Sequence, residues 1–126
     1  MQTMTKIDKP WGYELLWART GRYAAKVLYI RKGHKLSLQY HRHKEETMLL
    51  RSGRMQLILE DDHGVLREIL VAPGEAYHIP AGRKHRMIAL DEDCEVFEAS
   101  TTELEDVVRV EDSYGRTDGV SSRAVV

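Results

Sequence analysis

Cysteine is nearly absent from this sequence, which has one, Cys94, in 126 residues. A single thiol excludes an intrachain disulfide framework and favours a chain that folds around a hydrophobic core in a reducing compartment. No hydrophobic run approaches the roughly 20 residues that a membrane-spanning helix requires. The start of the chain lacks the apolar segment of a secretory signal peptide, so we expect a cytoplasmic protein.

An excess of either charge is also lacking, because 19 basic and 20 acidic residues leave a formal net charge of −1. Such a balance argues against a nucleic-acid or membrane partner. Short apolar runs separated by turn residues every eight to twelve positions predict an all-β sandwich or barrel of eight or nine short strands. We expect a flexible arm over residues 1–8, one domain over 9–116 and a disordered tail over 117–126.

The clearest pattern in the chain is the strict alternation of LSLQYHRH, residues 36–43. In a strand, Ser37, Gln39, His41 and His43 share one face, which places the two imidazoles about 7 Å apart. Two acidic residues, Glu45 and Glu46, follow within three positions. Imidazole and carboxylate suit zinc, manganese, iron, cobalt or nickel, so this stretch predicts a metal site.

A second motif, GEAYHIPAGRKH over residues 74–85, places Gly74, Pro80 and Gly82 before His85. Together the two motifs resemble the cupin family. This resemblance implies a single-domain jelly-roll barrel, or double-stranded β-helix, with one divalent metal ion inside. It also implies that the metal ligands are His41, His43, Glu46 and His85, and zinc is the favoured ion. Glu46 is preferred over Glu45 on the family register alone.

Four segments extend the resemblance to the carboxy-terminal domain of type II mannose-6-phosphate isomerases. In chain order they are KPWGYE, KLSLQYHRHKEE, IPAGRKHR and VVRVEDSYGR, and they span Lys9 to Arg116. The activity implied is aldose–ketose exchange between mannose 6-phosphate and fructose 6-phosphate. This chemistry needs a Lewis acid, a proton-transfer group and a cation for the phosphate.

The chain offers candidates for each of these roles. Gln39 lies on the predicted ligand face and is a candidate to contact substrate, while Arg86, Arg109 and Arg116 match family arginines and are candidates for the phosphate. Glu98 and Lys26 are the candidates for proton transfer. For Lys26, an ammonium that reaches out to water is the alternative that base rates of burial favour.

Two other function classes stay open at this point. One is a non-catalytic cupin that binds a metal and a sugar or sugar phosphate. The other is a different cupin metalloenzyme, either a dioxygenase or a nucleotide-sugar isomerase. We also expect a homodimer, with an aromatic segment around Trp11, Tyr13 and Trp17 that adds to the sheet edge of a neighbouring subunit.

Overall fold

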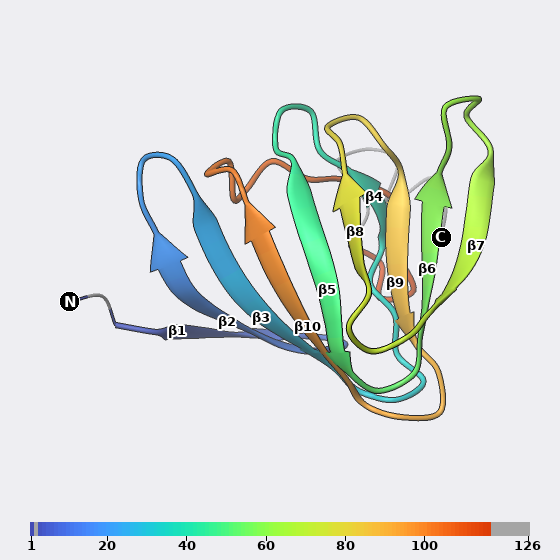
Figure 1. The fold of residues 1–126 in the computed structure, drawn as a ribbon, viewed down its shortest axis with the longest axis horizontal. Coiled ribbons are helices and arrows are strands. Elements are labelled where there is room, and N and C mark those ends of the chain that lie inside the picture. The colour runs from blue at the N-terminus through green and yellow to red at the C-terminus, as the bar shows by residue number, and fades with distance from the viewer. Residues whose placement is uncertain (2, 117–126) are drawn as a thin grey trace.

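The computed structural model describes residue 1 and residues 3–116, which form eleven β-strands and no helix (Figure 1). The strands are β1 (Thr5–Lys9), β2 (Gly12–Arg19), β3 (Ala24–Ile30), β4 (Leu38–Tyr40), β5 (Glu46–Ser52), β6 (Met55–Glu60), β7 (Leu66–Val71), β8 (Ala76–Ile79), β9 (His85–Ala89), β10 (Cys94–Ser100) and β11 (Val108–Glu111). Within this part of the chain, no helix is long and apolar enough to span a membrane.

The strands form two antiparallel sheets. One sheet has the order β1-β2-β3-β10-β5-β8, and the other has the order β11-β4-β9-β6-β7. Figure 1 shows the first sheet on the left, with β1 at its outer edge, and strands β9, β6 and β7 of the second sheet on the right. The predicted all-β, single-domain jelly-roll architecture is therefore confirmed, although the described residues form eleven strands where the sequence pattern predicted eight or nine.

Alternation along the central strands divides the barrel interior into two ends. In β3, β5 and β10 every second side chain is buried, as expected for strands with one face toward a core. The buried rows read Lys26, Leu28, Ile30 in β3; Glu46, Met48, Leu50 in β5; and Glu98, Val96, Cys94 in β10. Because the strands are antiparallel and in register, the charged residues gather at one end and the apolar residues at the other.

The apolar end is closed by the turn between β5 and β6. Its residue Gly53 has φ +102°, and a Cβ atom there would lie 2.3 Å from the carbonyl oxygen of Asp93. Only glycine avoids that clash, so the turn packs directly against the buried Cys94. This packing closes the apolar end of the barrel, and the charged residues at the opposite end form the candidate functional site.

Three segments differ from the sequence-based expectations or fall outside them. The expected arm over residues 1–8 includes β1, because Thr5–Lys9 pairs with β2 along its whole length. Residues 101–110 contain turns and the start of β11 and no helix. The expected tail over residues 117–126 lies outside the described residues.

Candidate metal centre and its cavity

Two imidazoles present the same nitrogen to one point inside the charged end of the barrel. His41 follows β4, and its Nδ1 lies 2.5 Å from the carbonyl oxygen of Asp106. His85 begins β9, and its Nδ1 lies 2.9 Å from the carbonyl oxygen of Arg83. Because a carbonyl oxygen only accepts hydrogen bonds, Nδ1 carries the proton in both rings. Each Nε2 therefore keeps a lone pair directed at the interior.

Both lone pairs face a carboxylate. Glu46 opens β5, and its Oε1 lies 3.3 Å from Nε2 of His41 and 3.0 Å from Nε2 of His85. Neither Nε2 has a hydrogen-bond partner among the described residues, although both rings are buried. Three electron-rich atoms thus converge with no proton between them, an arrangement that costs free energy unless a cation lies among them.

The geometry of this triad fits a divalent metal ion. The three ligand atoms lie within 4.8 Å of one another. Donors about 2.1 Å from a shared ion at right angles to each other would lie about 3.0 Å apart, close to both nitrogen–oxygen distances. Each Nδ1–H donates to a backbone carbonyl, the outer contact that usually orients a ligating histidine. His41, Glu46 and His85 would therefore hold the ion.

His43 is not part of this cluster, contrary to the convergence expected from the alternation. Strand β4 ends at Tyr40, and the backbone N–H groups of Arg42, His43 and Lys44 all donate to the Asp106 carboxylate. These three hydrogen bonds bend the chain and turn the His43 side chain to the exposed surface. Burial raises the pKa of Asp106, but the three N–H donors outweigh burial and lower it to about 2.

The same bend turns Lys44 inward, which the sequence reading missed. Its Nζ lies 3.3 Å from Glu46 Oε2 and 3.3 Å from Glu98 Oε2, and all three side chains are buried. Lys44 thus engages the outer oxygen of Glu46 and leaves Oε1 for the imidazoles. The only local signal was a lysine next to the acidic pair; the bend itself depends on Asp106, more than 60 residues away.

Charges in this cluster shift the pKa values of two carboxyl groups in opposite directions. Burial raises the pKa of Glu46, but the Lys44 ammonium beside its Oε2 opposes burial, and the pKa is held well below its usual range. Burial, followed by the negative charge of Glu46, raises the pKa of Glu98 to about 8. Glu46 is therefore the ionised ligand of the pair.

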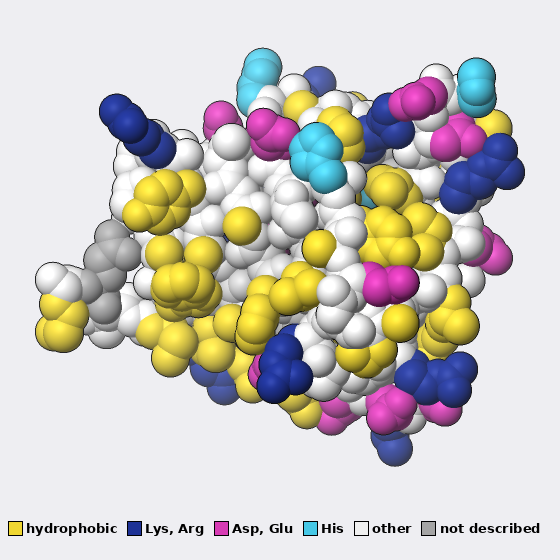
Figure 2. Space-filling view, viewed as in Figure 1, with side chains coloured by type: hydrophobic (Ala, Val, Ile, Leu, Met, Phe, Trp, Pro, Cys, Tyr) yellow, Lys and Arg dark blue, Asp and Glu magenta, His cyan; other side chains and the backbone are white. Residues whose placement is uncertain are grey.

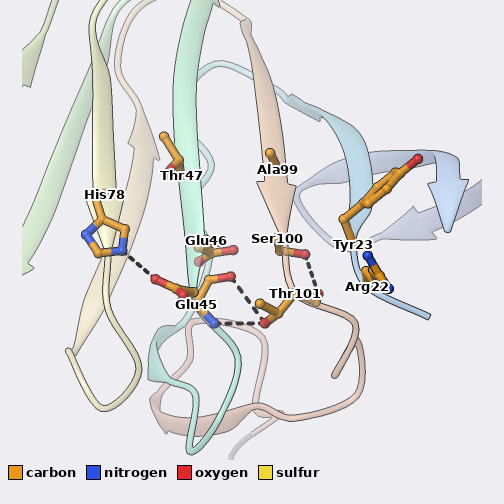
Figure 3. A pocket seen from close by; sticks show the side chains of 9 residues that line it. All are labelled: Arg22, Tyr23, Glu45, Glu46, Thr47, His78, Ala99, Ser100 and Thr101. Atoms are coloured by element: carbon orange, nitrogen blue, oxygen red, sulfur yellow. Dashed lines mark hydrogen bonds and ion pairs between the residues drawn. The ribbon is translucent and has the colours of Figure 1, made fainter. Parts of the chain in front are cut away.

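The other acidic residue of the motif, Glu45, faces outward. Its Oε2 lies 2.7 Å from Nε2 of His78 on the exposed side of the sheet, as Figure 3 shows. The structure thus brings Glu46, and not Glu45, to the two imidazoles. The one-residue difference follows from the strand register, since neighbouring residues of β5 point to opposite faces.

An interior cavity adjoins the triad at His41. Its charged and amide-bearing lining residues are Lys9, Glu14, Lys26, Gln39, Lys44, Glu98 and Arg109. A connected space adds Ser37 and Arg116. The Lys26 ammonium does not reach out to water, because it donates to Glu14 Oε1 at 3.0 Å within the interior. Glu14, which the sequence reading also missed, is the counter-ion that makes this burial possible.

The three candidate phosphate arginines differ in their surroundings. Arg86 donates from Nε to the carbonyl oxygen of Leu36 and from its two Nη atoms to Glu111, so it fastens β9 to its neighbours and lies outside the cavity. Arg116 forms two side-chain hydrogen bonds with Asp112 at the cavity margin. Arg109, paired with Gln39 across β11 and β4, lines the cavity itself.

Comparison with known proteins places this arrangement in a family. Residues 1–112 match the family described as mannose-6-phosphate isomerase C-terminal. The chain is 31% identical over 121 residues to the alginate biosynthesis protein AlgA of Pseudomonas aeruginosa, covering 92% of this chain and 24% of the relative. It is 33% identical over 117 residues to the mannose-1-phosphate guanylyltransferase of Escherichia coli, covering 88% of this chain and 23% of that protein. The chain therefore spans about a quarter of the length of these relatives.

Solved structures agree with the fold. The capsular polysaccharide assembling protein CapF of Staphylococcus aureus superposes with a TM-score of 0.76 at 18% identity, covering 88% of this chain and 35% of that one. Oxalate decarboxylase of Bacillus subtilis superposes with a TM-score of 0.76 at 17% identity, covering 91% of this chain and 32% of that one. These neighbours are cupins and show the barrel. By its matched residues and its barrel, the chain belongs to the cupin family of mannose-6-phosphate isomerase C-terminal domains.

Proposed function

We propose that this chain is a metal-dependent sugar-phosphate isomerase that interconverts mannose 6-phosphate and fructose 6-phosphate. The observation that carries the proposal is the triad of His41, Glu46 and His85 beside a cavity lined with charged groups. A divalent ion held by this triad would act as a Lewis acid toward the sugar carbonyl, and zinc is our first choice.

The cavity suits a hydroxylated, anionic ligand. Ser37 and Gln39 line the same space as Lys9 and Arg109, and their hydroxyl and amide groups can bind sugar hydroxyls. Burial lowers the pKa of Lys9; nearby Glu14 opposes this effect, and the positive charges of Lys26, Arg109 and Arg116 reinforce it. A phosphate near Lys9 and Arg109 would relieve this repulsion, so we assign the phosphate end to these two residues.

Of the two proton-transfer candidates, Glu98 is the better placed. Lys26 is committed to Glu14, whereas the Glu98 carboxylate lies beside Lys44 and lines the same cavity as His41. Aldose–ketose exchange moves a proton between adjacent carbons, which requires a group that can both take and return it within reach of the sugar. Glu98 would perform this transfer.

The test is a coupled assay of fructose 6-phosphate formation by protein of known metal content. We expect turnover by the metal-loaded protein and a loss of roughly 100-fold or more in kcat for Glu98→Gln. Glu95→Gln is the matched control, because Glu95 is on the same strand but on its opposite face. If the metal-loaded protein binds mannose 6-phosphate without converting it, the chain is a non-catalytic binding cupin instead.

The phosphate assignment has its own test by calorimetry. Lys9→Met and Arg109→Ala should each weaken mannose 6-phosphate binding about tenfold or more, because each removes a positive charge that would contact the phosphate. Binding of unphosphorylated mannose should stay nearly unchanged. Equal affinities of the wild type for mannose and mannose 6-phosphate would contradict the assignment.

One observation also supports a second candidate function. Two histidines and one carboxylate form the ligand set typical of non-haem iron(II) oxygenases. The charged cavity favours the isomerase, because a polar, anionic substrate matches its lining better than an apolar one does. Oxygen consumption by the iron-loaded protein, without isomerase turnover, would decide for the oxygenase.

A further inference from the structure

The outer face of the six-stranded sheet carries a groove that the proposed chemistry does not use. Its cavity of about 420 Å³ is lined by outward side chains of β3, β5 and β10, among them Val27, Leu49 and Phe97. Trp17 of β2 forms one wall and is 55% exposed, and Phe97 is 39% exposed. Large aromatic side chains that remain exposed together on a flat sheet face are typical of protein–protein interfaces.

The groove continues into a charged margin. Thr47 and Ala99 line both the apolar groove and a second, more open pocket at the end of the sheet (Figure 3). In that pocket Arg22, on the turn between β2 and β3, lies on one side, and Glu45 lies on the other. Figure 2 shows hydrophobic side chains on the left half of the molecule and a second group on the right, with histidine side chains near the upper border and charged side chains along the upper and lower borders.

We propose that this face is the contact surface for a second copy of the chain, related to the first by a two-fold axis. In a two-fold interface the same patch of both subunits meets itself. A contact between one residue of the first copy and a different residue of the second is therefore repeated with the two copies exchanged. An axis through the groove between Arg22 and Glu45 places the guanidinium of one copy opposite the carboxylate of the other. The margin is therefore complementary to itself, and the apolar floor is covered in both copies.

The projected size of the face sets a lower limit to the area that a dimer would bury. Four strands, β2, β3, β10 and β5, have seven or eight residues each. At about 4.8 Å between strands and about 3.3 Å per residue, they present roughly 450 Å² in projection. Side chains that protrude from the sheet, such as Trp17 and Tyr23, make the accessible area of the face larger than this projected area. A standard interface buries roughly 800 Å² per partner.

This interface differs from the expected exchange of an aromatic arm. Trp11 is 2% exposed in the core, and the Tyr13 ring stacks on Tyr29 of the same chain at a centroid distance of 5.0 Å. Only Trp17 of the three aromatics remains on the surface. Strand β1 pairs with β2 of its own chain. The partner would therefore contact the sheet face and not the sheet edge.

The test is the mass in solution, measured by sedimentation or light scattering across a dilution series. We expect the wild type to be a dimer and Phe97→Glu to raise the dimer dissociation constant roughly 100-fold or more, because it places charge in the buried centre. Leu70→Glu is the matched control, since Leu70 is 65% exposed on β7 of the other sheet and should not affect the dimer. A monomeric wild type, or a dimer that Phe97→Glu leaves intact, would overturn the proposal.

A charge exchange tests the two-fold orientation without altering the apolar floor. Arg22→Glu and Glu45→Arg should each weaken the dimer roughly tenfold, because each sets like charges opposite one another. The double variant should recover most of the wild-type affinity, since the pair is then restored in reverse. Both residues are exposed, so folding should not be affected. A double variant that is weaker than either single variant would overturn the orientation.

Discussion

Replacing Lys44 with methionine removes the cation that lies between two buried carboxylates. Its Nζ is 3.3 Å from both Glu46 and Glu98, and the three side chains are 5%, 2% and 7% exposed. Removing one partner of a buried ion pair typically costs about 3–5 kcal/mol, because the remaining charge stays desolvated. Burial and Glu46 already raise the pKa of Glu98 to about 8, so protonation of Glu98 relieves part of the cost. We therefore expect the lower end, about 3 kcal/mol.

The measurement is thermal and denaturant unfolding of the metal-free protein, where this loss corresponds to a fall in Tm of roughly 10–15 °C. Adding the divalent ion should recover more stability in Lys44→Met than it adds to the wild type, because the ion supplies the positive charge that Glu46 has lost. Lys6→Met is the matched control: the Lys6–Asp8 contact is 3.9 Å and largely exposed, so no measurable change is expected. A metal-free Lys44→Met protein as stable as the wild type would refute the reasoning.

Three further predictions concern the metal, the thiol and the second buried pair. His41→Ala should abolish stoichiometric metal binding by elemental analysis, whereas His43→Ala should retain it; loss of the metal in both would show that the bend straightens on binding. Burial raises the pKa of Cys94 to about 11 from an ordinary value near 9. Between pH 9 and pH 11 the thiol therefore loses its proton in the unfolded chain but keeps it in the folded one. The free energy of unfolding should therefore fall by about 2 kcal/mol from pH 9 to 11 relative to Cys94→Ala, and equal slopes would contradict it. Glu14→Leu or Lys26→Met alone should destabilise by about 3–5 kcal/mol, but the double variant should be near wild type in denaturant titrations; additive losses would contradict it.

Local alternation predicted much of the site correctly. Ser37 and His41 are buried and Gln39 lines the cavity, as their shared strand face required. His85 arrives beside them because β9 pairs with β4 at Gln39. In these positions a residue's face follows from its neighbours in the chain, so the sequence pattern was sufficient.

The pattern failed where a distant residue controls the backbone. The Asp106 carboxylate accepts three N–H groups of residues 42–44 and replaces the strand pairing that the alternation assumed. As a result, the side chain of Lys44, and not that of His43, points into the interior. Lys26 shares its strand face with Leu28 and Ile30, so the alternation places it inward, but its counter-ion Glu14 lies on the neighbouring strand and could not be found from that alternation. Neither contact leaves a periodic signal, because each joins segments brought together only by the fold.

The division of the barrel into two ends explains how such a small domain can maintain a charged site. Buried ion pairs add little net stability, since desolvation offsets most of their attraction. The favourable free energy must come from the apolar end, where Ile30, Leu50 and Leu57 are fully buried, at about 1.5–3 kcal/mol per side chain. Both ends belong to the same strands, so the apolar rows fix the register that sets Lys26 against Glu98 and Glu46 beside Ser100. A one-residue slip would turn every charged residue of the site outward. The apolar end of the barrel therefore fixes the positions of the candidate metal ligands.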